Sequence, residues 1–182
     1  IFYIQYAKGK LALPSEDLEA EMYAVLMTTM EAHNKMQYEI SNFAEKGYES
    51  LHNKIYWDND EYVGFGAGAH GYLHGVRYSN HGPIKKYIET VQSGIRPLVH
   101  DHTVTDEERL EEQMFLGLRK VEGVPHHVFE SKFNCSIQEI YGKKIDKLRK
   151  EGLLDVDKDG IHLTRKGRFV GNEVFQQFLF ED

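Results

Sequence analysis

Two capping boxes in the C-terminal half constrain the fold of this chain more than any other sequence feature. In Thr105–Glu108, and again in Ser136–Glu139, a hydroxyl residue stands three positions before a glutamate. In such a pair each side chain bonds the other residue's backbone N–H, which fixes where a helix begins. We therefore expect one helix to begin at each box, the first ending near Arg119 and the second at Gly152.

The sequence around these two helices has the layout of a winged-helix-like domain. A break at Gly123-Val124-Pro125 precedes a short helix expected over His127–Phe133. Two apolar runs flank Asp157–Gly160 and predict a β-hairpin, and Thr164 is suited to cap a last helix. Helices, a hairpin and a final helix predict an α+β domain over residues 105–182.

The N-terminal part alternates helix and strand in the rhythm of an α/β fold. Ser15 is suited to cap a helix from Glu16 to about His33, because its hydroxyl can accept a first-turn N–H. Met36–Ser41 follows as a strand, and Ile1–Tyr6 reads as a strand end or an arm.

Glu39 lies inside that predicted strand and has two interpretations. It is either a solvent-facing strand position or an inward-facing carboxylate of a barrel, and the sequence slightly favours the first. Beyond it, Asn42–Tyr62 is too long and irregular for a simple turn, so we expect its own aromatic residues or a ligand to order it.

The middle of the chain is expected to connect the two parts. Tyr62–Phe65 reads as a short strand and Arg77–Pro83 as a loop. Proline suits the start of a helix, so we predict one over Ile84–Gln92, followed by a linker over Ile95–Val104. These boundaries give a first domain over residues 1–72, a helical connector over 73–104 and a C-terminal domain over 105–182.

Composition and charge exclude several classes of protein. A net charge of −7 argues against a general nucleic-acid binder, although Lys143, Lys144, Lys147, Arg149 and Lys150 cluster on one predicted helix. No apolar run approaches the roughly 20 residues that span a bilayer, so we expect no transmembrane segment. The single Cys135 excludes an internal disulfide and suits a reducing, cytoplasmic setting.

Among the ten histidines, His52 has the most informative neighbours. The pairs His70/His74, His100/His102 and His126/His127 lack the carboxylate or cysteine spacing that is diagnostic of zinc. His52 stands close to Tyr56 and to the only tryptophan, Trp57. A histidine with aromatic walls could ligate haem iron. The alternative is a histidine that is only hydrogen-bonded within an aromatic loop.

The stretch Tyr38–Tyr72 carries the other candidate chemistry. Gly64, Gly66 and Gly68 stand two residues apart, and closely spaced glycines let backbone N–H groups approach a ligand. They do not complete a G-x-G-x-x-G fingerprint and no helix is expected directly after them. A purely structural turn therefore stays open.

Three segments of this stretch resemble the coproporphyrinogen III oxidase-like radical S-adenosylmethionine (SAM) family. They are YEISNFA from Tyr38, HNKIYW from His52 and YVGFGAGAHGY from Tyr62. The His-Asn-x-x-Tyr-Trp element is similar to the haem chaperone (HemW-type) branch rather than to the oxygen-independent oxidases. The segments LALPSEDLEAEMY and LTRKGRFVGNEV also look like the family, so the resemblance covers nearly the whole chain.

The resemblance implies a fold and two binding sites. Residues 1–72 would form the C-terminal end of a partial (β/α) radical SAM barrel with YEIS as its last strand, followed by the winged-helix-like domain. SAM would lie against Gly64, Gly66, Gly68, Ala69 and His70. Haem would be bound by His52, with Asn53, Tyr56 and Trp57 shaping its pocket.

Two departures from the family pattern qualify this picture. The cluster-binding Cys-x-x-x-Cys-x-x-Cys is absent, and Cys135 lies in the wrong domain to replace it. The chain also lacks an initiator Met, so we expect it to begin inside the barrel, with the cluster ligands upstream of residue 1. Such a chain would be inactive and bind no cofactor by itself. Gly71 stands where the family usually has Ser after Ala-His.

The leading functional hypothesis is a haem chaperone. The complete protein would bind a [4Fe–4S] cluster, SAM and haem, and would pass haem to acceptor proteins. The alternatives are an oxygen-independent coproporphyrinogen III oxidase of porphyrin biosynthesis and a winged-helix DNA-binding regulator. Homodimer formation and peripheral membrane contact stay open.

Overall fold

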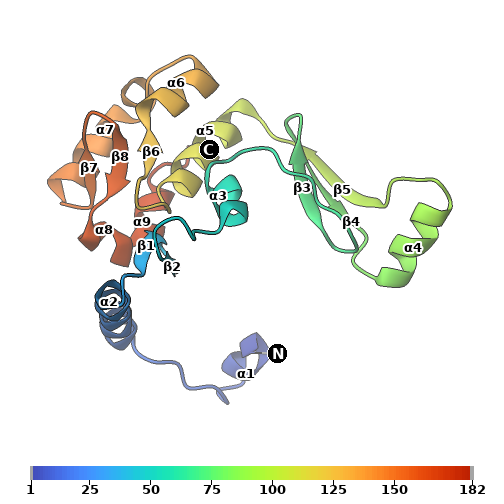
Figure 1. Ribbon diagram of the computed structural model, residues 1–182, viewed down its shortest axis with the longest axis horizontal. Helices are drawn as coiled ribbons and strands as arrows, with labels where there is room; N and C mark the ends of the chain where they lie inside the picture. Colours follow the sequence, from blue (N-terminus) through green and yellow to red (C-terminus); the bar gives the residue numbers. More distant parts are fainter. Residues whose placement is uncertain (1, 181–182) are drawn as a thin grey trace. The chain divides into compact units, whose positions relative to one another are not determined.

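The computed structural model describes residues 2–180 and has a mixed α/β fold with small, open sheets. The chain forms two compact units, Ile1–Tyr48 and Glu49–Asp182. Figure 1 labels the helices and strands of both units. In the part of the chain that is described, no helix is long and apolar enough to cross a membrane.

The first unit contains two helices and a two-stranded antiparallel sheet. Its elements are α1 (Phe2–Ala7), α2 (Glu16–Ala32), β1 (Met36–Glu39) and β2 (Asn42–Ala44). As predicted, the Ser15 hydroxyl accepts the Leu18 N–H at the start of α2, where acidic residues complement the helix dipole. The strand end considered for Ile1–Tyr6 is wrong over the described residues, because Phe2–Ala7 is helical.

Glu39 is fully buried, so the favoured solvent-facing interpretation is wrong. Its carboxylate turns back over the connection between β1 and β2, where Oε1 accepts the Ser41 N–H (2.8 Å) and the Asn42 amide (2.5 Å). A buried carboxylate needs such donors to offset its lost hydration. Glu39 therefore organises the turn that closes this small sheet.

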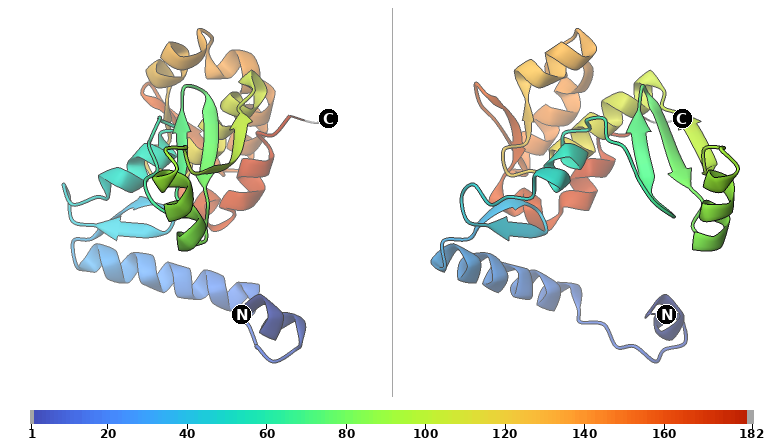
Figure 2. Two further views of the ribbon diagram at one scale, coloured as in Figure 1. Left: turned by 90° about the vertical axis from the view of Figure 1, so that its right-hand side faces the viewer. Right: turned by 45° about the vertical axis from the view of Figure 1, so that its right-hand side comes forward.

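The second unit begins with α3 (Leu51–Trp57), a helix inside the stretch predicted to be irregular. A three-stranded antiparallel sheet follows, in the order β3–β4–β5. In the sequence, α4 (Ile84–Gln92) connects β4 to β5. The strands are β3 (His70–Leu73), β4 (Val76–Asn80) and β5 (Leu98–Thr103). Figure 2 shows these strands side by side, with α4 beyond one end of the sheet.

Three predictions for this region are wrong. The loop predicted over Arg77–Pro83 contains β4, and the linker predicted over Ile95–Val104 contains β5. The strand predicted over Tyr62–Phe65 is only an isolated bridge between Tyr62 and Tyr72. The predicted helix over Ile84–Gln92 is confirmed, with Pro83 as its N-cap.

The turn between β3 and β4 explains how these strands form. His74 and Gly75 both have positive φ, at 52° and 74°. Two consecutive residues in this region make the tight turn that matches the twist of a β-hairpin. Arg77 and His102 then pair across β4 and β5, so the sheet depends on contacts far apart in the sequence.

The C-terminal region has the predicted winged-helix-like order. It comprises α5 (Asp106–Gly117), β6 (Val124–Pro125), α6 (His126–Phe133), α7 (Ile137–Lys150), β7 (Leu154–Val156), β8 (Gly160–Leu163), α8 (Arg165–Phe169) and α9 (Gly171–Gln176). Both capping boxes are formed as predicted. The single last helix predicted after Thr164 is divided in two, because the backbone leaves the helical region at Val170.

The core of the second unit lies mainly in this C-terminal region. β6 joins the hairpin in the strand order β6–β8–β7, and the helices pack around it. Its fully buried apolar side chains come from the region of α5 to α9 and from the short sheet: Met114, Leu118, Val124, Phe129, Ile137, Tyr141, Ile145, Leu148, Leu154, Ile161, Leu163, Val174 and Phe178. This apolar core supports the sites described next.

Candidate functional site

Helix α3 places the four predicted haem-site residues within seven residues of one another. The Ser50 hydroxyl accepts the Asn53 N–H at 3.3 Å and so caps the helix. Residues four apart lie on the same side of a helix. His52 therefore shares a side with Tyr56, and Asn53 shares the next side with Trp57.

His52 and Tyr56 form a hydrogen-bonded pair. The Tyr56 Oη lies 2.8 Å from His52 Nε2, and the two rings meet edge to face with centroids 4.7 Å apart. His52 is exposed, whereas Tyr56 is half-buried. An imidazole and a phenol, both groups able to bind iron, are thus presented together at an accessible position.

Trp57 faces the C-terminal region instead. The Arg119 guanidinium lies over its ring, 4.4 Å from the centroid, which is favourable for a cation against an aromatic face. The indole Nε1 is buried and, among the described residues, has no hydrogen-bond partner. Trp57 therefore helps to hold α3 against the C-terminal region.

Charged groups fix the end of α3 to the C-terminal region. Lys120, whose side chain is only 5% exposed, pairs with the Asp58 carboxylate. Lys132 donates to the Asp58 carbonyl at 2.5 Å and to the Asp60 carboxylate at 2.8 Å. These two lysines come from beyond the end of α5 and from α6, so the position of α3 depends on the C-terminal helices.

The predicted SAM loop is shaped by its own hydrogen bonds. Gly64 N donates to the Tyr78 hydroxyl (3.2 Å) and Gly68 N to the His81 carbonyl (2.9 Å). The Asn80 amide donates to Gly66 O at 3.0 Å. Part of the predicted backbone donor set is therefore used within the chain, as the structural-turn alternative requires.

Gly66 is a glycine of this loop that has free space beside its backbone. Its φ of +101° favours glycine, and a Cβ there would meet no atom within 4 Å. Gly64 is different, since a Cβ would lie 2.0 Å from the His70 carbonyl oxygen. His70 itself begins β3, and its backbone closes the loop.

Gly71, the departure from the family pattern, has a structural reason in this chain. A Cβ at this position would lie 2.2 Å from Cζ of Tyr78 on the neighbouring strand. The Tyr78 ring occupies the space that a serine side chain would need. Glycine at residue 71 and tyrosine at residue 78 therefore belong together.

Tyr62 connects the two candidate sites. Its ring meets Tyr56 edge to face with centroids 4.5 Å apart, and its backbone pairs with Tyr72 of β3. Burial raises the pKa of Tyr62, and nearby Tyr56 adds to this effect. These contacts join α3, which carries the predicted haem-site residues, to the sheet that follows the glycine loop.

Arg77 and Glu112 were missed by the sequence reasoning. Arg77 pairs with both carboxylate oxygens of Glu112 from α5 and lies over the Tyr72 ring, 5.2 Å from the centroid. Burial raises the pKa of Glu112, and Arg77 offsets only part of that effect. Only the pairing of β4 with its neighbours, which local patterns did not predict, could have identified this contact.

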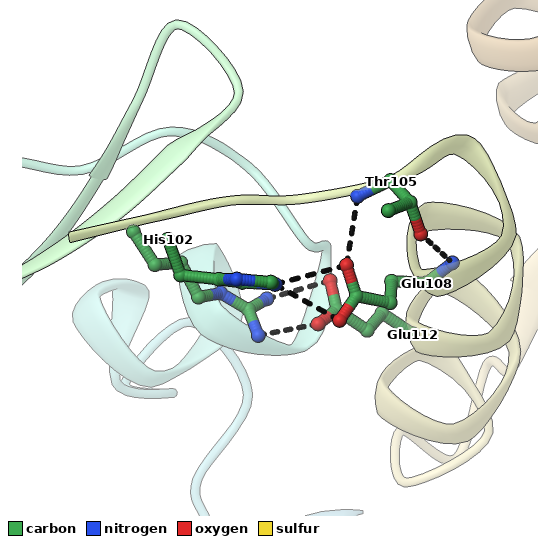
Figure 3. A network of polar contacts seen from close by, with 5 residues as sticks. His102, Thr105, Glu108 and Glu112 are labelled. Carbon is green, nitrogen blue, oxygen red and sulfur yellow. Dashed lines mark hydrogen bonds and ion pairs between the residues drawn. The ribbon is translucent and has the colours of Figure 1, made fainter.

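A second polar contact lies beside the first (Figure 3). His102 Nε2 lies 2.9 Å and 3.0 Å from the two carboxylate oxygens of Glu108. The same carboxylate accepts the Thr105 N–H of the capping box, which lowers the pKa of Glu108, and His102 lowers it further. Together the two contacts join the β3–β5 sheet to α5.

The remaining histidines form no metal centre in the described part of the chain. His74 lies in the β3–β4 turn, and His100 and His102 lie on exposed positions of β5. His126 contacts the carbonyl of Asp157 at 3.1 Å. Across residues 2–180, no three His, Cys, Asp or Glu side chains come close enough to hold a metal ion.

A cleft and a basic surface contain none of the predicted site residues. A cleft of ≈ 470 Å³ lies between Asn59–Glu61, the β3–β4 turn, α5 and α6, and no predicted site residue lines it. On the basic helix α7, Lys144 donates to the Leu179 carbonyl and Lys147 to the Gln177 side chain. Part of the basic cluster is therefore used within the domain.

Comparisons with known proteins identify relatives of this chain. Residues 104–170 match the HemN C-terminal domain. The chain is 47% identical to the haem chaperone HemW of Bacillus subtilis over 181 residues, and 44% identical to that of Lactococcus lactis over 182 residues. Each match covers 100% of this chain and 48% of the relative, so the chain spans about half the length of these curated relatives.

A solved structure shows the same fold at lower sequence identity. It is coproporphyrinogen III oxidase (HemN) from Escherichia coli, described as a radical SAM enzyme, with a TM-score of 0.71 at 18% identity. The likeness covers 98% of this chain and 45% of that one. The mixed α/β fold class is thereby confirmed. The chain belongs to the coproporphyrinogen III oxidase-like radical SAM family, in its haem chaperone (HemW-type) branch.

Proposed function

We propose that the complete protein, meaning this chain with any further sequence its gene encodes, binds haem and transfers it to acceptor proteins. The observation that carries the proposal is the exposed His52–Tyr56 pair on α3, in a chain 47% identical to a haem chaperone. The donor set fits haem, because imidazole and phenol are both known ligands of haem iron. Apolar side chains that remain exposed on α3, Leu51 and Ile55, offer contact to a macrocycle.

Within this proposal α3 receives haem and the C-terminal region positions α3. Arg119 contacts Trp57 at the end of the helix and Lys120 pairs with Asp58 just after it, so both leave the His52–Tyr56 pair free of their contacts. A carrier must release its cargo, and an exposed site leaves haem accessible to an acceptor protein. Homodimer formation, peripheral membrane contact and a cytoplasmic location stay predictions.

The complete protein would also hold SAM and a [4Fe–4S] cluster. SAM fits the open backbone at Gly66, and Gly64, Gly68, Ala69 and His70 shape the loop around it. A cluster with SAM supplies radical chemistry in this family, and its cysteine ligands would come from sequence outside this chain. In this scheme residues 1–72 close the barrel, residues 73–104 connect and residues 105–182 form the C-terminal domain.

The two alternative functions have weaker support. An oxidase is favoured only by the fold shared with the Escherichia coli enzyme at 18% identity. A DNA-binding regulator would need the basic residues of α7 free for phosphates, and Lys144 and Lys147 are bound within the domain.

Haem titration of the complete protein tests the chaperone proposal. We expect saturable binding of ferric haem with a Soret shift, followed by transfer of haem to an apo-acceptor such as apomyoglobin. His52→Ala should weaken binding by roughly 10–100-fold, whether His52 binds iron or supports the group that does. His100→Ala, a change of an exposed histidine on β5, is the matched control and should bind normally.

The proposal fails if the wild-type protein does not bind haem, or if His52→Ala and His100→Ala bind it equally well. Formation of protoporphyrinogen from coproporphyrinogen III by the reconstituted protein under anaerobic conditions would favour the oxidase instead.

A further inference from the structure

Tyr56 carries an oxygen atom that is placed to bind iron. The 2.8 Å contact between Tyr56 Oη and His52 Nε2 engages one of the two imidazole nitrogens through which a histidine binds metal. For His52 to bind iron through Nε2, this contact would have to break. The phenol oxygen, by contrast, can bind iron while its contact with the histidine is kept.

We propose that Tyr56 is the protein ligand of ferric haem iron through its phenol oxygen, with His52 as the hydrogen-bonded residue that positions it. This inference rests on the proposed haem-binding function and replaces His52 as the iron ligand. The Fe–O bond would form as the hydroxide on the haem iron leaves, taking the phenolic proton with it as water, and the iron would stay ferric throughout.

The surroundings of the pair support this assignment. The hydrogen bond to the His52 imidazole, at 2.8 Å, holds the phenol oxygen of Tyr56 in place. The Tyr62 ring packs edge to face against Tyr56 and fixes its orientation. The Ser50 cap and the Lys120–Asp58 ion pair hold the two ends of α3, so His52 and Tyr56 stay one helical turn apart.

The apolar residues of α3 lie next to this pair. Leu51 and Ile55 are 76% and 36% exposed and, like the pair, stand four residues apart. They precede His52 and Tyr56 by one position each, so they form the adjoining stripe of the helix. A macrocycle bound at Tyr56 could therefore cover apolar side chains that the described structure leaves in solvent.

Resonance Raman and absorption spectra of the ferric haem complex test the assignment. The samples are the complete protein and its Tyr56→Phe, His52→Ala and Tyr48→Phe variants, each titrated with hemin. We expect tyrosinate vibrations and a high-spin ferric spectrum in the wild type, and their loss in Tyr56→Phe. His52→Ala should keep the tyrosinate vibrations with roughly 10–100-fold weaker affinity. Tyr48→Phe, at a tyrosine that is 81% exposed, should match the wild type.

A further variant makes the result independent of any effect on folding. Tyr56→His should bind haem with a histidine-type spectrum, because it places an imidazole where the phenol stood. The inference is overturned if Tyr56→Phe keeps the wild-type spectrum while His52→Ala loses it, and the chaperone proposal then stands with His52 as ligand. Failure of the wild-type protein to bind hemin would instead remove the chaperone proposal itself.

Discussion

The C-terminal helices and helix α3 are held in place by different kinds of interaction. The C-terminal helices bury apolar side chains completely, among them Leu118, Phe129 and Val174. Helix α3 has no buried residue and is fixed by charges and an aromatic face, through Lys120 on Asp58 and Arg119 over Trp57. Burial of each large apolar side chain contributes about 1.5–3 kcal/mol, and the core contains many such side chains, whereas α3 depends on one buried lysine whose charged hydrogen bond contributes about 1.5–3 kcal/mol.

Under the proposed function, this difference suits a C-terminal region that positions a ligand-binding helix. A close-packed core resists small displacements, because any shift opens voids or causes clashes. Separate polar contacts can break and re-form one at a time. We therefore expect the C-terminal region to stay rigid while α3 adjusts when it takes up or releases a ligand.

The largest expected effect comes from opening the core. Phe129→Ala should lower the free energy of unfolding by about 3–5 kcal/mol, because it removes a fully buried ring and leaves a cavity. Denaturant unfolding followed by circular dichroism measures the loss. Phe65→Ala is the matched control at a phenylalanine that is 87% exposed, and should cost less than about 0.5 kcal/mol. Equal losses in the two variants would contradict the placement of the core.

A smaller but more local effect is expected at Lys120. Lys120→Ala removes a buried charged donor from Asp58 and should cost about 1.5–3 kcal/mol. Hydrogen exchange should speed up at the amides of α3 and stay unchanged in α7. Lys143→Ala changes an exposed lysine of α7 and serves as the control. Unchanged protection of α3 in Lys120→Ala would show that this contact does not hold the helix.

A further loss of stability is expected from a change where β3 packs against β4, because residues 71 and 78 are in close contact there. Gly71→Ser should destabilise the protein by about 1–3 kcal/mol, because the new Cβ would overlap the Tyr78 ring. In a Tyr78→Ala background the same substitution should cost much less. A double-mutant cycle from unfolding curves measures this coupling. Equal costs in both backgrounds would rule out the proposed link between residues 71 and 78.

The smallest expected effect concerns the two capping boxes and pH. The Thr105 N–H lowers the pKa of Glu108 below its ordinary value of 4.5, and the Ser136 N–H does the same for Glu139. A lowered pKa stabilises the fold above pH 4.5, and this contribution is lost as the pH falls through the folded-state pKa. In urea unfolding, the difference between wild type and Glu108→Gln should therefore shrink below pH 4.5.

Glu139→Gln is the comparison variant for that pH series. The Glu139 carboxylate also accepts a backbone N–H, from Ser136, but it lacks the contact with His102 that Glu108 makes. A difference that persists undiminished at low pH would show that the carboxylate charge is not what stabilises the box.

The accuracy of the sequence predictions follows the same division of the molecule. Helix α5, helix α7 and the β7–β8 hairpin were predicted well because capping residues and turn residues act within a few positions. Strands β4 and β5 were predicted as loop and linker, since no local pattern shows that Arg77 would pair with His102. Glu39 was misjudged for a related reason, because its burial depends on a turn that folds back over it.

The candidate site shows both kinds of information. The motif from His52 to Trp57 was visible in the sequence and pointed to haem through its resemblance to a family. The residues alone did not reveal that a Ser50 cap makes it a helix, which sets Tyr56 against His52 and turns Trp57 toward Arg119. Residue type and local spacing determine which groups are available and where helices begin. Which of those groups meet is decided by long-range packing, because partners such as Trp57 and Arg119 lie far apart along the chain.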